Sequence, residues 1–151
     1  MNAEAHAQYA LFLNYRTRFA AARAEAERAG ALDARDGRVA AILCRVDDWS
    51  QMLAQAVTAG RDAIRLAPRD PLAHLFLAEA LADSGETAAA QREIGAASAL
   101  ISAASSAYLR AELHREQANL EGDRGDGHAR VGAFQAARDA QPGWLYRSVE
   151  L

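Results

Sequence analysis

The sequence predicts an all-α protein, and three observations support this fold class. Alanine, the residue with the highest helix propensity, supplies about a quarter of the 151 residues. The β-branched residues are few and never clustered, which argues against a sheet. Apolar residues recur at helical spacing in paired segments, and this pattern repeats along the chain every 34 residues.

The clearest pair of segments lies between residues 70 and 100. Asp70 is suited to cap a helix, with Pro71 at the first helical position, where the missing N–H costs nothing. Gly85 is expected to end this helix, because glycine tolerates the left-handed conformation of a helix exit. Thr87 is expected to cap a second helix, whose apolar stripe ends at Leu100. The segment therefore predicts a helix–turn–helix unit.

The same pattern tiles the chain without gaps as units 3–36, 37–70 and 71–104. A fourth unit fits at 111–144 only if residues 105–110 are treated as an insertion, and residues 145–151 remain as a short C-terminal cap. The register is visible in single columns, such as Cys44 and Ala78, which are 34 residues apart. We therefore expect one domain over residues 1–151.

The third unit resembles a tetratricopeptide repeat (TPR), a 34-residue helix–turn–helix found in stacked arrays. The matching residues are Leu77, Ala78, Leu81 and Gly85 in the first half, and Ala90, Ile94 and Ala97 in the second. This resemblance implies a right-handed α-solenoid of about four stacked repeats with a short C-terminal capping segment. It also implies that the first helix of each unit lines a concave face.

The remaining elements follow from the same pattern. Helices are expected at 3–16, 19–29, 38–48 and 52–66, with Tyr9 and Phe12 among the inward-facing residues of the first. The turn between the third and fourth helices is expected at 47–50, with Ser50 capping the fourth. The six-residue insertion lengthens the first helix of the fourth unit. Residues 121–128 hold three glycines and predict a loop, and the tail after Pro142 is strongly apolar.

Composition excludes several classes of function. A formal net charge of −3 predicts no general affinity for nucleic acid. No apolar run approaches the length of a membrane span, and the first residues lack the features of a signal peptide. The single Cys44 excludes an internal disulfide framework and is expected to pack as a small buried spacer. We therefore expect a cytoplasmic protein.

No catalytic or metal-binding pattern is found. His6, His74 and His114 fall in one repeat column, so stacking would hold them about 10 Å apart, too far to share a metal without other ligands. The glycines of residues 121–128 neither follow a strand nor precede a lysine, so they do not form a phosphate-binding loop. The sequence predicts no enzyme, no cofactor and no metal.

The candidate binding residues lie on the expected concave face. Some TPR proteins hold a peptide's terminal carboxylate there with Lys, Arg and Asn, whereas the corresponding positions here are Ala7, Leu11, Ile42, Leu72 and Phe76, so that clamp is absent. The groove is instead expected to mix apolar and charged groups. The expected partner-binding residues are Leu11, Tyr15, Arg38, Arg45, Leu72, Leu75, Glu79, Arg115 and Asn119.

The sequence therefore favours a non-catalytic scaffold or adaptor that binds a peptide or helix of a partner protein in its groove. One alternative is a homo-oligomerisation module, in which the apolar C-terminal segment pairs with another copy of the chain. The other is an accessory region of a larger enzyme or secretion assembly. The identity of the partner is not encoded in the repeat pattern, because repeat arrays reuse one scaffold with variable surface residues.

Overall fold

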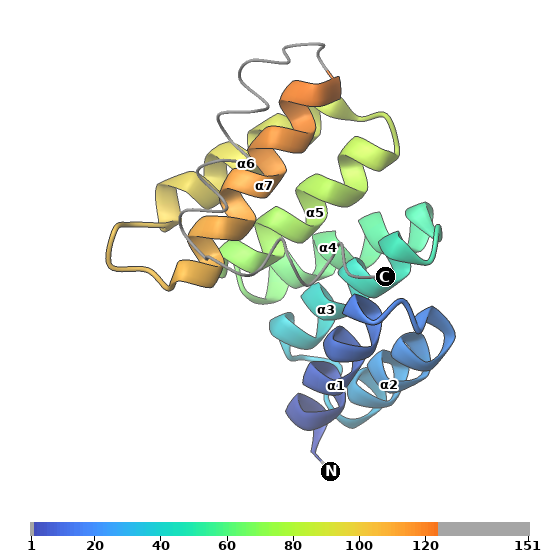
Figure 1. Ribbon diagram of the computed structural model, residues 1–151. Helices are drawn as coiled ribbons and strands as arrows, with labels where there is room; N and C mark the ends of the chain where they lie inside the picture. Colours follow the sequence, from blue (N-terminus) through green and yellow to red (C-terminus); the bar gives the residue numbers. More distant parts are fainter. Residues whose placement is uncertain (1, 124–151) are drawn as a thin grey trace.

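The computed structural model describes residues 2–123, with side chains described as far as Glu121. This part of the chain is all-α (Figure 1). Its helices are α1 (Ala3–Tyr15), α2 (Phe19–Leu32), α3 (Gly37–Trp49), α4 (Leu53–Leu66), α5 (Pro71–Asp83), α6 (Thr87–Leu100) and α7 (Ala107–Asp123). The second helix of the expected fourth unit, the C-terminal cap and the alternative dimer contact of the C-terminal segment lie outside the described residues.

The helices form stacked pairs. The pairs α1–α2, α3–α4 and α5–α6 are each joined by a short turn, and they follow one another along the molecule in chain order (Figure 1). The first helices also contact one another in sequence: α1 packs on α3, α3 on α5, and α5 on α7. This arrangement is an all-α helical-repeat solenoid.

The first helix of each complete pair begins at the same kind of cap. The N-cap residues are Asn2, Asp36 and Asp70, which are 34 residues apart, and each side chain accepts a backbone N–H from the first turn. These bonds satisfy donors that have no partner within the helix. The predicted cap at Asp70 and the helical Pro71 are thus confirmed.

The second helices begin without such caps, and two predictions fail here. Thr87 is the first residue of α6, not its cap, and the actual N-cap, Glu86, makes no side-chain capping bond. Ser50 does not cap α4 either: it ends α3, where its hydroxyl donates to the carbonyl of Val46 at 2.6 Å. The turn starts later than predicted because α3 continues through Asp47 and Asp48, whose side chains are buried.

The tight turns use a left-handed residue at one fixed position of each unit. Thr17, Gln51 and Gly85 have φ values of 58°, 61° and 81°, and these residues are again 34 apart. The conformational freedom of glycine predicts this geometry at Gly85, but the same backbone conformation occurs at Thr17 and Gln51 without glycine. A non-glycine residue in the left-handed conformation costs conformational energy, and two of these three turns carry that cost.

Small residues bring the helices close together. Cys44, Ala78 and Ala97 are fully buried, as expected for the small-residue columns. At Gly60 on α4 an added Cβ would lie 2.9 Å from Leu77 Cδ1 and 3.0 Å from Cys44 Sγ. The backbone of α4 therefore approaches α3 and α5 so closely that a side chain at this position would force its neighbours to shift.

Tyr9 and Phe12 are exposed, which corrects the prediction that they face the core. They are 43% and 58% exposed, and their rings stack with centroids 6.2 Å apart. The residue equivalent to Phe12 in the second unit, Val46, is fully buried among residues of the first unit. No described helix covers this face of α1, so its equivalent residues stay on the surface.

The fourth unit begins irregularly. Residues 101–106 are non-helical, and α7 starts at Ala107, after Ser106 whose hydroxyl accepts the N–H of Leu109 at 3.2 Å. The helix runs through Asp123, so the first residues of the predicted 121–128 loop are helical. The remainder of that loop lies outside the described residues.

Candidate functional site

A pocket of about 280 Å³ opens on the side of the molecule formed by the first helices. All four first helices contribute to its wall. The lining residues are Gln8, Leu11 and Tyr15 of α1, Arg38, Ala41 and Ile42 of α3, Leu72 and Phe76 of α5, and Tyr108 of α7. The pocket is thus assembled by the stacking itself, since no single helix pair carries more than part of its surface.

The wall of the pocket is mainly apolar. Leu72 and Phe76 lie one helical turn apart on α5, and they line the pocket together with Leu11 of α1 and Ile42 of α3. The pocket is therefore suited to an apolar group.

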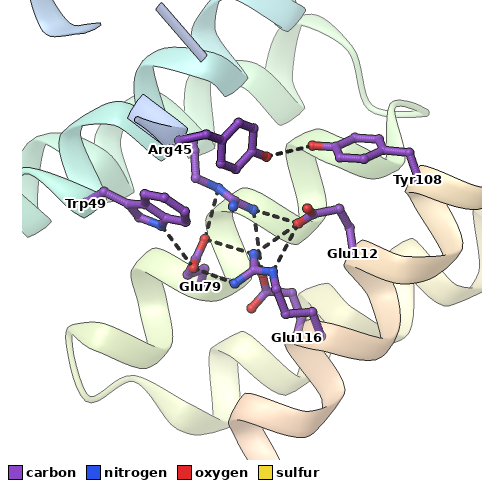
Figure 2. Close-up of polar contacts among 8 residues, drawn as sticks. Arg45, Trp49, Glu79, Tyr108, Glu112 and Glu116 are labelled. Atoms are coloured by element: carbon purple, nitrogen blue, oxygen red, sulfur yellow. Dashed lines mark hydrogen bonds and ion pairs between the residues drawn. The ribbon is translucent and has the colours of Figure 1, made fainter. Parts of the chain in front are cut away.

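Two tyrosines connect the first and last described helices at this pocket. The hydroxyl groups of Tyr15 and Tyr108 lie 3.0 Å apart and are hydrogen-bonded, although the residues are 93 positions apart in sequence (Figure 2). The Tyr15 ring also meets Trp49 edge-on, with centroids 5.6 Å apart. Burial raises the pKa of both phenols, so both stay protonated at neutral pH.

A buried ion cluster lies beside the pocket. We define it as Arg45 of α3, Glu79 of α5, and Glu112, Arg115 and Glu116 of α7 (Figure 2). All five residues are buried, and Arg45 and Glu112 have no exposed surface. The two guanidinium groups lie between the three carboxyl groups.

Both arginines in the cluster bind Glu79 and Glu112. Arg45 places Nε 3.0 Å from Glu79 Oε2 and Nη2 3.0 Å from Glu112 Oε2. Arg115 donates from Nη1 to Glu79 Oε1 at 2.9 Å and from Nη2 to Glu112 Oε2 at 3.0 Å. Arg115 also contacts Glu116. Charged hydrogen bonds of this kind hold α7 against α3 and α5.

Aromatic rings enclose Arg45. Its guanidinium carbon is 4.0 Å from the ring centroid of Phe76 and 5.3 Å from that of Trp49. The indole N–H of Trp49 donates to Glu79 at 3.2 Å, which fixes the tryptophan on the same carboxylate. Arginine suits this place because its flat guanidinium can stack on rings while its edge donates to carboxylates.

The carboxyl groups of Glu79 and Glu116 have very different pKa values, although both lie in the ion cluster. Burial alone would raise the pKa of Glu79, but the positive charges of Arg45 and Arg115 outweigh it and lower the pKa to about 2. Burial, together with repulsion from Glu79, raises the pKa of Glu116 to about 8. At neutral pH Glu79 is therefore ionised beside the two guanidinium groups, whereas Glu116 keeps its proton.

The predicted site residues separate into two groups. Leu11, Tyr15, Arg38 and Leu72 line the pocket. The others do not: Arg45, Glu79 and Arg115 are buried in the ion cluster, Leu75 is fully buried in the hydrophobic core, and Asn119 lies half-buried on α7. Arg45, Glu79 and Arg115, which the sequence predicts to lie on the groove surface, are instead buried and paired within the chain.

Sequence reasoning missed Tyr108, Glu112 and Glu116. Tyr108 falls in the predicted insertion 105–110, so it has no counterpart in the earlier units. Glu112 and Glu116 do have counterparts, because they align with the pocket residues Leu72 and Phe76, 40 positions earlier. The available signal was helical spacing: Tyr108, Glu112 and Arg115 follow each other at intervals of four and three, which places them on one side of α7.

Two of the histidines, His6 and His74, connect the two helices of their pairs. His6 Nδ1 lies 2.6 Å from Glu25, and His74 Nδ1 lies 2.8 Å from Glu93, so the same contact joins the two helices of the first and third units. His114 instead meets a neighbour on its own helix. Over residues 2–121, no three metal-binding side chains come together. None of the described helices has the length and apolar character needed to cross a bilayer.

No protein-family model and no curated protein matches the sequence. Solved structures do match it. The MamA structure "MamA MSR-1 C2" has a TM-score of 0.59 and 17% identity, covering 93% of this chain and 77% of that chain. PilF of Pseudomonas aeruginosa has a TM-score of 0.61 and 20% identity, covering 97% of this chain and 64% of that chain. Because both are TPR proteins and the helix pairs here keep a 34-residue register, this chain has the fold of the tetratricopeptide-repeat proteins.

Proposed function

We propose that this chain is a non-catalytic interaction protein that holds a segment of a partner protein in the pocket formed by α1, α3, α5 and α7. The observation that carries this proposal is the apolar pocket of about 280 Å³ on the side lined by the first helices. Apolar pockets with a few polar groups at the edge are typical binding sites. Repeat arrays present such surfaces as scaffolds for other proteins.

The buried ion cluster supports the proposal indirectly. It occupies the space beside the pocket and pairs Arg45 and Arg115 with carboxyl groups of α5 and α7. These long-range pairs fix α7 relative to α3 and α5, and they hold Tyr108 in the pocket wall. A pocket that is formed before binding loses less conformational entropy when the partner arrives.

Affinity capture from extracts of the source organism tests this function. Leu11→Gln places an amide in the pocket wall, so partner capture should fall strongly, with the captured protein identified by mass spectrometry from the wild-type sample. Leu32→Gln is the matched control, because Leu32 is 58% exposed on α2 and does not line the pocket. Equal capture by the wild type and the folded Leu11→Gln variant would place the binding surface elsewhere.

A second candidate function is self-association through the outer face of α1. The stacked and exposed rings of Tyr9 and Phe12 favour it, since exposed aromatic pairs are common in interfaces. Sedimentation velocity over a hundredfold range of concentration tests it. A concentration-dependent mass that Phe12→Ser abolishes would support association, and a constant monomer mass would exclude it.

We also propose a cytoplasmic location. It agrees with a single buried cysteine, Cys44, which has no partner for a disulfide in this chain. A role as the accessory region of a larger assembly is the remaining alternative for the function. Fractionation of source cells with an antibody against the chain examines both, because it reports the compartment and the size of the native complex.

A further inference from the structure

We propose that the bound partner segment carries a large apolar side chain next to an acidic side chain, with the apolar group in the pocket and the carboxylate on Arg38. This inference rests on the proposed function and specifies the chemistry of the partner. It rests on three observations. The pocket wall is mainly apolar, the guanidinium group of Arg38 has no partner among the described residues, and Arg45 and Arg115 are already paired in the ion cluster.

Among the described residues that line the pocket, Arg38 is the one that carries a charge. It is exposed on the first turn of α3, and its backbone N–H is engaged in a bond to the Asp36 cap at 2.8 Å. Its guanidinium group has no hydrogen-bond or ion-pair partner among the described residues. A free guanidinium at the edge of an apolar wall is a ready donor to a carboxylate.

The arginines deeper in the molecule cannot supply that charge. Arg45 and Arg115 are buried, and both already contact Glu79 and Glu112. Both guanidinium groups are paired inside the protein, and Arg38 is the charged side chain among the described residues of the pocket wall. A lysine or arginine of the partner at this place would face a like charge, which disfavours binding.

The inner wall offers little to a polar group. Tyr15 and Tyr108 bond to each other through their hydroxyl groups, and Gln8 Nε2 already donates to Glu4 at 2.9 Å. Leu11, Ile42 and Phe76 present only carbon. A buried polar group of the partner would therefore lose hydrogen bonds to water without replacement. A large aliphatic or aromatic side chain gains apolar contact here, and the volume of about 280 Å³ accommodates one.

The carboxylate comes from a side chain and not from the end of a chain. Binding of a terminal carboxylate would require several donors that converge on it. The described wall of the pocket supplies one guanidinium group and the amide of Gln8, which already donates to Glu4. A single arginine at the rim matches an Asp or Glu placed within about one helical turn of the apolar anchor. The two sources are separated below by blocking the peptide terminus.

Selection from a random-peptide library tests the proposal even while the natural partner is unidentified. The library is selected on the wild type, on Arg38→Glu and on Arg69→Glu, an exposed arginine in the loop before α5 that does not line the pocket. The wild type and Arg69→Glu should enrich peptides with a large apolar residue beside Asp or Glu. Arg38→Glu should enrich Lys or Arg beside the same apolar residue.

Binding of synthetic peptides then measures the effect by fluorescence anisotropy. For an enriched acidic peptide with an amidated C-terminus, Arg38→Glu should weaken affinity at least tenfold, and replacing the peptide acid with lysine should restore binding to this variant. Loss of binding upon amidation would assign the contact to the terminal carboxylate and overturn the proposal. Circular dichroism confirms that each variant is folded.

The outcomes separate this inference from the function on which it rests. Apolar peptides without an acidic preference, bound equally by Arg38→Glu, would overturn the inference and leave the pocket as the binding site. Enriched peptides that bind Leu11→Gln as tightly as the wild type would overturn both, as would a library that yields no enriched sequence.

Discussion

Gly60 shows how far a single residue controls the packing of this stack. A Cβ at this position would meet Leu77 at 2.9 Å and Cys44 at 3.0 Å. We predict that Gly60→Ala lowers the free energy of unfolding by about 1–3 kcal/mol, because overpacking outweighs the better helix propensity of alanine. Gly95→Ala is the matched control: nothing lies within 4 Å of its added Cβ, so it should stabilise by up to about 1 kcal/mol. Denaturant titration measures both, and equal effects would refute the close approach.

The left-handed turn residues allow a second test at the same scale. Gln51 has φ 61°, and we predict that Gln51→Gly stabilises the protein by about 0.5–1 kcal/mol by removing strain from this turn. Gly85→Ala should do the reverse and cost about 1–2 kcal/mol, although its Cβ would meet no atom within 4 Å. Thermal melts compare the two. A destabilised Gln51→Gly variant would show that the glutamine side chain matters more than the backbone strain.

At the scale of elements, the ion cluster makes stability depend on pH. Glu116 has a pKa of about 8 in the folded protein, above its unfolded value, so the folded state binds more protons between about pH 4.5 and 8. Stability from this group is fully present below that range and falls as the pH rises through it, by at most about 1.4 kcal/mol per pH unit. Asp48, which is also buried and has a pKa of about 8, acts in the same direction. Glu79 acts oppositely: with a pKa of about 2, its contribution is lost as the pH falls below about 4.5.

We therefore predict that Glu116→Gln flattens the decline of stability between pH 5 and 8 and makes the variant more stable than the wild type at pH 8.5. The amide keeps the shape of the protonated acid but cannot ionise. Chemical denaturation at several pH values measures the effect, and Glu86→Gln, an exposed carboxyl group outside the cluster, serves as the comparison. A Glu116→Gln profile parallel to that of the wild type would mean that Glu116 is ionised when buried.

The contact of α7 with α3 gives another prediction. Arg45→Met keeps an unbranched chain between the rings of Phe76 and Trp49 but removes the charge that faces Glu79 and Glu112. Stability should fall by about 3–5 kcal/mol, because the remaining carboxylates lose a buried partner. Adding Glu79→Gln should recover part of this loss, and the double-mutant cycle isolates the coupling. Additive losses would show that the two residues act separately.

The elements differ in how well the sequence predicts them. The first helices of the three complete pairs are capped by the side chains of Asn2, Asp36 and Asp70. This local signal makes the cap at Asp70 predictable. The second helices begin without side-chain caps, so the predictions at Ser50 and Thr87 fail. Those starts are set by the tight turn and by tertiary packing, which have no short-range signal.

At the scale of the whole molecule, contacts between helices far apart in the sequence make the site only partly predictable. Leu11, Tyr15, Arg38 and Leu72, which the resemblance assigns to the concave face, line the pocket. The resemblance could not show that Arg45 is buried, because its partners Glu112 and Glu116 lie on α7, after the insertion that interrupts the repeat. A charge pattern on one helix predicts a solvated face unless a distant helix is known to supply the opposite charges.

The outer face of α1 supports a prediction at this scale. Phe12→Ser should change the stability of the monomer by no more than about 0.5 kcal/mol, because Phe12 is 58% exposed. Val46→Ser, at the equivalent position one unit later, should cost about 2 kcal/mol or more, because Val46 is fully buried. Thermal melts at low protein concentration test this. A large loss in Phe12→Ser would show that the exposed face is covered in solution.

The bond between Tyr15 and Tyr108 changes how this stack should unfold. In an ordinary repeat array each unit touches only its neighbours, so the ends open first and unfolding spreads inward. Here α7 is bonded to α1 through the tyrosines and to α3 through Arg45, across 93 and 67 positions of sequence. These bonds join distant units into one cooperative system. Fluorescence of Trp49 and far-ultraviolet circular dichroism should therefore report a single coincident transition, and Tyr15→Phe should separate the opening of the first helix pair from the rest.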